Sequence, residues 1–264
     1  MTSTAESIRE LWRYRELFYF MVWRDIKVRY KQSILGALWA IIQPFVTMVV
    51  FTLFFNKVAK VQPPDDMPYP IFSYSALLPW TYFSSAIGQA GLSLVSNRNL
   101  LTKVYFPRVV IPASSTMRGL LDFSIASMRL AGLMVYYSFP PSWELLLWPV
   151  LVIPLLMLAL GVGMLFAAVN VRYRDVQYVL PFVTQLGLFI SPIIYPLDLF
   201  PERWRPILAL NPLCGIIEAF RASLVPSRPI DLHLLGISLT VTVLIFAAGV
   251  FYFKRTARSF ADIV

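Results

Sequence analysis

Two residue types that often do chemistry occur once each in this chain, as Cys214 and His233. A single cysteine cannot form an intrachain disulfide, and a single histidine cannot build a His-rich metal site. A Ser-His-Asp relay would depend on His233, and no nucleophile motif accompanies it. The G-x-x-x-x-G-K-[ST] loop of Walker-type ATPases is missing as well. We therefore predict no catalytic residue, no metal site and no cofactor bound by this chain.

Three charged residues, Arg118, Asp122 and Arg129, fall within one otherwise apolar stretch, 109–137. The first two are spaced i,i+4, so on one face of a helix they can neutralise each other. Arg118 can alternatively extend its head group to the membrane surface. Arg129 lies deeper, where a cation needs water, a carbonyl or a charged partner. We therefore treat Arg129 as a candidate lining residue of an aqueous path.

The elements that hold these charges belong to a membrane protein. Hydrophobic residues make up 58% of the 264 residues and charged residues 14%, against about 45–50% and about 25% in soluble domains. A soluble fold of this size would have too few charges to cover its surface. Disordered chains are poor in apolar residues. The composition therefore argues against a soluble enzyme and excludes an intrinsically disordered chain.

Stretches with few charges recur six times, each long enough to cross a bilayer, which takes about 20 apolar residues. No alternating barrel pattern is visible, and backbone amides in lipid must pair within their own helix. The sequence therefore predicts an all-α polytopic membrane protein with a single transmembrane domain of about six helices. The predicted spans are residues 32–56, 70–95, 109–138, 144–170, 176–196 and 232–253.

The first segment, 1–31, carries acidic and basic residues and no long apolar core, which is unlike a signal peptide. Aromatic residues and arginines alternate from Ile8 onward. This mixture predicts an amphipathic helix in the membrane interface, where aromatic rings favour the headgroup layer. A solvated tail is the alternative, and the density of aromatic residues argues against it.

Lysine and arginine set the predicted orientation, because positive loops stay on the cytoplasmic side. Fifteen of the 23 cations fall on one predicted side: Arg9, Arg13, Arg15, Arg24, Lys27, Arg29, Lys31, Arg98, Lys103, Arg108, Arg172, Arg174, Lys254, Arg255 and Arg258. Both termini, including the tail 254–264, are therefore predicted to be cytoplasmic. The net charge of +9 is thus a topology signal, and we expect no nucleic-acid partner.

Two connections differ from ordinary loops. Segment 96–108, on the cytoplasmic side, mixes apolar and aromatic residues with cations and meets Pro107, which ends a helix. A short helix there can dock a cytoplasmic partner, or its aromatic residues can turn back into the headgroups. Segment 197–230, on the outer side, is apolar and interrupted by prolines. It predicts a re-entrant helical hairpin between spans five and six, with Glu218 and Arg221 paired on one face.

Aromatic residues recur at helical spacing on spans one and five. Such rows usually face lipid or pack in the core, but flat rings can also let sugars slide without fixed hydrogen bonds. The candidate residues of a glycan path are Phe51, Phe55, Arg129, Tyr178, Phe182, Gln185, Phe189 and Tyr195.

Six motifs carry a resemblance to a known family. They are WRDIKVRYKQSILGALWAIIQP (23–44), LLPWTYFSSAI (77–87), SLVSNRNLLTKVYFPRVVIP (93–112), NVRYRDVQYVLPF (170–182), SPIIYP with PERWRPILALNP (191–212) and RSFADIV (258–264). In this order and spacing the chain resembles the type-2 ABC exporter permeases of bacterial surface polysaccharides, the O-antigen export permeases in particular. Residues 117–129 depart most from the family by carrying more charge.

The resemblance implies a homodimer in the bacterial inner membrane, two copies of a separate cytoplasmic ABC ATPase that holds ATP and Mg, and a channel between the two permeases. The implied substrate is a polysaccharide linked to undecaprenyl diphosphate. By resemblance the ATPase-coupling residues are Asn97, Arg98, Leu100, Leu101, Lys103, Tyr105 and Phe106. The interface helix would offer Trp23, Arg24, Lys27, Arg29 and Lys31 to the lipid diphosphate and to membrane lipids.

Other functions remain in competition. An ABC exporter of capsule, of a teichoic-acid-like polymer or of a small amphiphile would share the same architecture. An ion-coupled secondary transporter or a channel usually needs midplane carboxylates or a filter motif, and Asp122 is the clear midspan acid here. A membrane-embedded modifying enzyme would need a cluster of acids or histidines.

Overall fold

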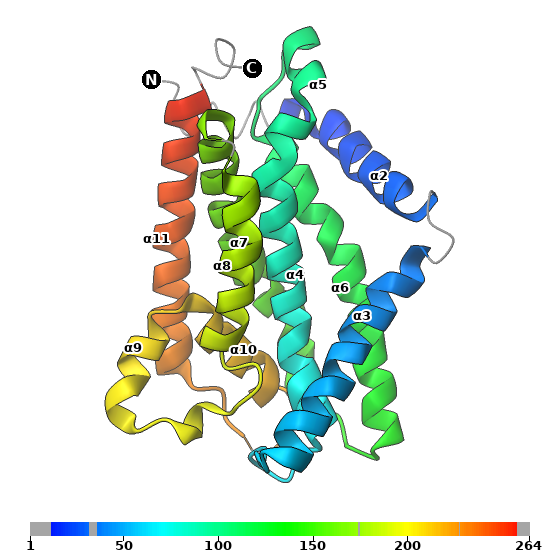
Figure 1. Ribbon diagram of the computed structural model, residues 1–264, viewed down its shortest axis with the longest axis vertical. Coiled ribbons are helices and arrows are strands. Elements are labelled where there is room, and N and C mark those ends of the chain that lie inside the picture. Colours follow the sequence, from blue (N-terminus) through cyan, green and yellow to red (C-terminus); the bar gives the residue numbers. More distant parts are fainter. Residues whose placement is uncertain (1–11, 32–35, 174, 227, 258–264) are drawn as a thin grey trace.

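The computed structural model describes residues 12–31, 36–173, 175–226 and 228–257, and every regular element within these ranges is helical (Figure 1). The helices are α2 (Arg15–Lys31), α3 (Gly36–Phe51), α4 (Tyr69–Ser96), α5 (Arg98–Lys103), α6 (Val110–Tyr136), α7 (Trp148–Arg172), α8 (Val176–Ile190), α9 (Arg205–Ala209), α10 (Pro212–Ala222) and α11 (Leu232–Ala257). A π-helical turn (Thr52–Val58) continues α3, and 3₁₀ turns occur at Trp143–Leu147, Leu197–Leu199 and Glu202–Trp204. The predicted all-α fold is confirmed.

Three helical segments are long and apolar enough to cross a membrane: α6, the continuous stretch Trp143–Arg172 and α11. Helix α4 is 28 residues long and lies in the middle of the bundle, where most of its side chains are buried. The apolar segments Ile42–Val58 and Val176–Ile190 are shorter. Each of the six predicted spans thus contains one of these helices, and the number that cross the membrane stays a prediction.

Two helix ends differ from the predicted span boundaries. Helix α8 ends at Ile190, whereas the predicted span ran to residue 196. The proline at 192 explains the early end, because it disfavours helical geometry in the residue before it. Helix α11 continues to Ala257, so Lys254 and Arg255 form its last turn instead of belonging to a tail. Cations at that end favour the helix, since they complement the negative end of its dipole. Residues 258–264 of the predicted tail lie outside the described residues.

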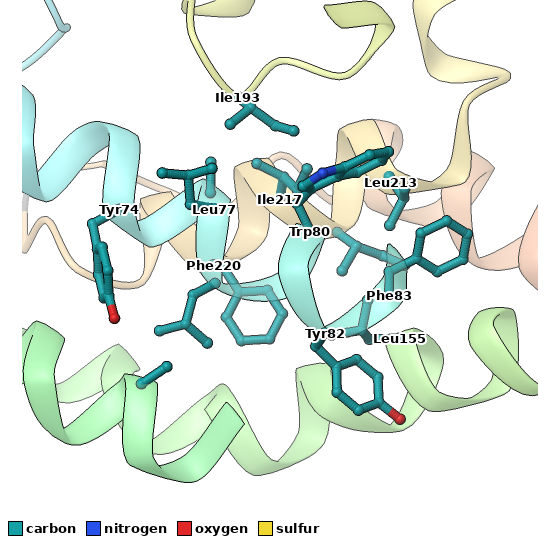
Figure 2. Packing of buried hydrophobic residues seen from close by; sticks show 14 of the residues in the cluster. Tyr74, Leu77, Trp80, Tyr82, Phe83, Leu155, Ile193, Leu213, Ile217 and Phe220 are labelled. Carbon is teal, nitrogen blue, oxygen red and sulfur yellow. The ribbon is translucent and has the colours of Figure 1, made fainter. Parts of the chain in front are cut away.

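A core rich in aromatic residues surrounds α4, which packs against α6, α7 and α10. Figure 2 shows Ile217 and Phe220 of α10 beside Leu77 of α4. The Phe220 ring meets the Trp148 ring edge-on, with centroids 5.0 Å apart. The Trp148 Nε1 donates a hydrogen bond to Ser223 Oγ over 2.8 Å. These contacts place α10 inside the bundle, between helices that come from distant parts of the sequence.

Helices α7 and α11 touch through their backbones. A Cβ atom added at Gly249 would lie 2.3 Å from the Gly161 carbonyl oxygen, and one added at Gly161 would lie 2.7 Å from the Phe246 Cα. Neither contact leaves room for a side chain, so glycine is required at both positions. The two helices therefore pack at the closest distance that backbones allow.

A second apolar cluster lies at the end of the bundle that holds α5, the first turns of α2 and the last turns of α11 (Figure 1). Its buried members come from six segments and include Met21, Leu94, Phe106, Ile111 and Phe253. Arg108 also donates a hydrogen bond to the Ala257 carbonyl, which ties the start of α6 to the end of α11. Helices α9 and α10 lie at the opposite end of the molecule.

Candidate functional site

The short helix α5 forms directly after α4, and its apolar side chains hold it to the bundle. Asn97 ends α4, and its Nδ2 donates to the Ser93 carbonyl over 2.8 Å. Leu100 and Leu101 are half-buried against the second apolar cluster. Phe106, just beyond the helix, is 5% exposed. These residues fix the position of α5 on the cluster beneath it.

The outward side of α5 differs from the apolar and aromatic face expected from the sequence. Phe106 is buried, and of the other apolar side chains in this segment only Val104 and Tyr105 are well exposed. The reason is that Leu100, Leu101 and Phe106 cover the second cluster. Tyr105 is 90% exposed, beside the exposed polar residues Arg98, Asn99, Thr102 and Lys103. The surface available to a partner is therefore basic and polar around one tyrosine.

Helix α2 packs one face on the second cluster and exposes aromatic residues on the other, including Tyr19, Phe20 and Trp23. Apolar or aromatic residues thus occur on both faces of α2, and its place in the membrane interface stays a prediction. The described part of the predicted segment begins at residue 12. The earlier part of the predicted interface segment, from Ile8, lies outside the described residues.

The basic residues of α2 are not equivalent. Arg24 Nη2 lies 2.8 Å from Asp25 Oδ1 and donates to Asn97 Oδ1 over 3.2 Å. Lys27 Nζ lies 5.4 Å from the centroid of the Trp23 ring, within the range of a cation–π contact. Of the five residues predicted to meet the lipid diphosphate, Trp23, Lys27 and Lys31 are exposed, whereas Arg24 and Arg29 are half-buried.

Arg29 makes a contact that the sequence did not predict. Its Nη2 lies 3.0 Å from Asp122 Oδ2 of α6, and both side chains are partly exposed. Arg118 donates to the Gln89 side-chain oxygen of α4, and Gln89 Nε2 donates to Ser85 Oγ over 2.6 Å. The Asp122 carboxylate therefore has a partner on α2 that helical spacing on α6 alone could not reveal.

A polar cavity of about 350 Å³ adjoins the Arg29–Asp122 ion pair. Five helices line it: α2, α3, α4, α6 and α8. Its polar members are Arg29, Gln43, Thr81, Ser84, Ser85, Asp122 and Thr184. Tyr82 and Phe123 add rings, whose centroids lie 5.9 Å apart. Gly119 also lines it, and a Cβ there would lie 3.0 Å from the nearest atom of the Tyr82 ring, so a larger residue would press on this ring. Sequence reasoning did not predict that these residues lie together around one cavity.

The candidate path residues fall into two groups. Those of α8 (Tyr178, Phe182, Gln185 and Phe189) are exposed, because α8 buries only Val176 and Leu180 among its side chains. The others are partly buried, namely Phe51, Phe55, Arg129 and Tyr195. Their assignment to a path stays a prediction.

The partly buried path residues make specific contacts. Phe51 and Phe55 pack edge-on against each other, with centroids 5.7 Å apart. The Arg129 guanidinium carbon lies 5.8 Å from the centroid of the Tyr74 ring. Tyr195 donates its hydroxyl hydrogen to the Phe189 carbonyl over 2.7 Å. Arg129 thus gains a cation–π contact inside the bundle, which lowers the cost of placing a cation there.

The end of the molecule that holds α9 and α10 (Figure 1) contains a charge network around Arg221, which is fully buried. Arg221 Nη1 lies 2.8 Å from Glu218 Oε1, so the pair predicted from i,i+3 spacing is confirmed. The guanidinium also donates to the Ile193 carbonyl over 2.8 Å and lies 3.7 Å from the centroid of the Phe72 ring. Arg228 Nη2 bonds the other Glu218 oxygen over 3.1 Å. This network joins α4, the segment after α8 and α10, and most of it is invisible in the sequence.

Cys214, on the same helix, is fully buried. Burial, with the nearby Glu218 carboxylate, raises the pKa of its thiol to about 12, while Arg221 acts in the opposite direction. At neutral pH the thiol is therefore protonated, which makes it a poor nucleophile. Cys214 packs as a small apolar side chain in this structure.

Comparisons with known proteins connect this arrangement to a family. The family model described as "ABC-2 type transporter" matches residues 16–225. The chain is 32% identical to the "O-antigen export system permease protein RfbA" of Myxococcus xanthus, over 97% of this chain and 98% of that protein. It is 28% identical to a protein of the same name from Klebsiella pneumoniae, over 91% of this chain and 92% of that one.

A further relative, 29% identical over 84% of this chain and 87% of its own length, is the "Polysialic acid transport protein KpsM" of Escherichia coli. The region matched by the family model, residues 16–225, contains α5, the residues that line the polar cavity and the Glu218–Arg221 pair. The helical bundle and these matches lead to one conclusion: this chain is a multi-pass membrane protein of the ABC-2 type transporter family.

Proposed function

We propose that this chain is the transmembrane permease subunit of an ATP-driven exporter of O-antigen polysaccharide. The observation that carries the proposal is its likeness, over 97% of its length, to an O-antigen export permease. The polysaccharide would be linked to undecaprenyl diphosphate and would cross the bacterial inner membrane through a channel between two copies of the chain. The chain itself performs no catalysis, and ATP and Mg are bound by a separate ATPase.

Helix α5 would receive the movement of that ATPase. Tyr105 and the polar residues around it offer a contact surface, and Leu100 with Leu101 ties the helix to the bundle. From α5 the movement would pass through Asn97 to Arg24 of α2, and from Arg29 to Asp122 of α6. Both α2 and α6 contribute side chains to the lining of the polar cavity. Closure of the ATPase dimer would in this way change the cavity.

Cations of α2 would attract the diphosphate of the lipid carrier. Lys27 and Lys31 are exposed, and Arg29 is partly exposed beside the cavity. Charge-assisted hydrogen bonds from such groups to phosphate are stronger than neutral ones. The exposed aromatic row of α8 would face the second copy or the glycan path. With both termini cytoplasmic, α5 and α2 meet the ATPase and α9 and α10 lie on the outer side.

Co-purification tests this function. The chain is produced with the ABC ATPase of a polysaccharide export operon, and the complex is isolated by a tag on the ATPase. We expect Tyr105→Asp to abolish co-purification, because it places a carboxylate at the centre of the contact surface. The matched control is Tyr136→Asp, at an exposed tyrosine that is the last residue of α6 and lies outside the α5 segment. Equal recovery of the Tyr105→Asp and wild-type permeases would contradict the coupling role of α5.

A capsule polysaccharide is the second candidate substrate, because the chain is also 29% identical to a polysialic acid transport protein. Complementation separates the two. The gene is introduced, with its ATPase, into one strain that lacks its O-antigen permease and one that lacks its capsule permease. Surface O-antigen restored only in the first strain supports the proposed substrate, and surface capsule restored only in the second supports the alternative.

A further inference from the structure

The polar cavity presents an unusual set of hydrogen-bonding groups. Thr81, Ser84 and Thr184 each donate their hydroxyl hydrogen to a backbone carbonyl of their own helix, at 3.1, 3.3 and 3.0 Å. Each of these oxygens can still accept a hydrogen bond. Ser85 Oγ already accepts one from Gln89. The three hydroxyls therefore offer acceptors to a ligand that brings its own O–H donors, and the Gln43 amide can both donate and accept.

Among the described residues that line the cavity, the one cation is Arg29. Arg29 presents only N–H donors, which suit an anion that can accept hydrogen bonds. Its side chain is 34% exposed beside Asp122, so a phosphate can reach the guanidinium from solvent. Hydroxyl acceptors and a guanidinium thus lie side by side, and each selects a different part of a ligand.

Aromatic rings complete the cavity. Tyr82 and Phe123 are buried and contact one another, and Tyr82 donates its hydroxyl hydrogen to the Thr116 carbonyl over 3.2 Å. Rings held in this way give a fixed apolar surface beside polar groups, as sugar-binding sites require. The volume, about 350 Å³, lies at the lower end of the range of small-ligand pockets, about 300–1,000 Å³.

We propose that this cavity binds the sugar unit joined directly to the lipid diphosphate, with Arg29 on the phosphate and the hydroxyls of Thr81, Ser84 and Thr184 accepting from the sugar. The inference rests on the proposed function, because it assumes a glycosyl diphosphate as substrate. It assigns a sugar-binding role to side chains of α4 and α8, in addition to the cations of α2. The Arg29–Asp122 ion pair would then exchange its carboxylate for a phosphate when the ligand enters.

Two soluble probes test the proposal with the purified full chain in lipid nanodiscs. One is farnesyl diphosphate, and the other carries N-acetylglucosamine on the same diphosphate. Binding is measured by titration calorimetry. We expect the sugar-bearing probe to bind about tenfold more tightly, the effect of one or two net hydrogen bonds. Thr184→Val and Ser84→Ala should each reduce this difference and leave the affinity for farnesyl diphosphate unchanged. Arg29→Gln should lower the affinity of the chain for both probes.

Thr240→Val is the matched control for Thr184→Val. Thr240 of α11 is exposed and also donates to the carbonyl four residues earlier, over 2.9 Å, but lies outside the cavity. It should leave both affinities at wild-type values. Equal binding of the two probes to the wild-type chain would overturn the sugar site and leave the proposed function standing. Failure of both probes to bind would count against the lipid-diphosphate substrate itself.

Discussion

Arg24 Nη2 of α2 lies 3.2 Å from Oδ1 of Asn97, the residue at which α4 ends and α5 begins. The same guanidinium is paired with Asp25, which directs it toward α5. Through this contact the interface helix holds the helix that we assign to ATPase coupling. One side chain thereby joins two elements through residues that are 73 positions apart in the chain.

Arg24→Ala should lower glycan export strongly while it reduces the folding stability of the protein only slightly. The lost hydrogen bond is half-exposed, so we expect about 0.5–1.5 kcal/mol of lost stability together with a several-fold fall in glycan export. Export is measured as surface glycan per permease in the membrane, and stability as the thermal midpoint. Arg13→Ala, at an exposed position before α2, is the control. Wild-type export by Arg24→Ala would contradict the link.

Phe106 and Tyr105 are neighbours with opposite expected effects. Phe106→Ala removes a ring that is 5% exposed and should cost about 3–5 kcal/mol of folding stability. Tyr105→Ala removes a ring that is 90% exposed and should leave the thermal midpoint unchanged while weakening ATPase binding. Thermal unfolding in detergent and co-purification measure the two effects. Equal midpoints for both variants would show that Phe106 does not anchor this segment.

Arg221→Met should destabilise the end of the molecule that holds α10. The substitution removes the partner of the buried Glu218 carboxylate and the donor to the Ile193 carbonyl. Breaking a buried ion pair costs about 3–5 kcal/mol, and we expect the lower end because Arg228 still pairs with Glu218. The thermal midpoint reports the loss. Arg203→Met, at an exposed arginine, should shift it little, and equal shifts would argue against the network.

Cys214 should resist alkylation as long as the protein is folded. Its thiol is buried and its pKa is raised to about 12, so very little thiolate is present at pH 8. Because it is the only cysteine, N-ethylmaleimide incorporation should begin only when denaturant unfolds α10. The control is a Cys214→Ala, Thr102→Cys double variant, in which the exposed position should react at once. Rapid labelling of the native wild-type protein would contradict the buried state.

Phe182 and Phe189 of α8 test the glycan path. Their rings are 61% and 55% exposed, so alanine should change the folding stability of the single chain little. If they line the path, the double variant should lower surface glycan several-fold at equal permease levels. The control is Leu244→Ala, at an exposed position of α11. Wild-type surface glycan from the double variant would assign the rings to lipid contact or packing.

The sequence predicts the helices well, because uncharged runs and flanking cations are local properties of the chain. It also predicts the Glu218–Arg221 pair, which depends only on spacing within one helix. It does not predict the Arg29–Asp122 pair or the burial of Phe106. Both depend on how α2 and α5 pack against distant segments, and composition carries no signal for that. The sequence does not predict the polar cavity for the same reason, since its lining residues come from five helices.

The contact between Gly161 and Gly249 has a mechanical consequence. Because the two backbones are in direct contact at these glycines, a shift or tilt of α7 against α11 would cause steric clashes. Helix α8, by contrast, buries only two of its side chains, Val176 and Leu180. In a cycle of opening and closing we therefore expect α7 and α11 to move as one unit and α8 to change its position relative to them.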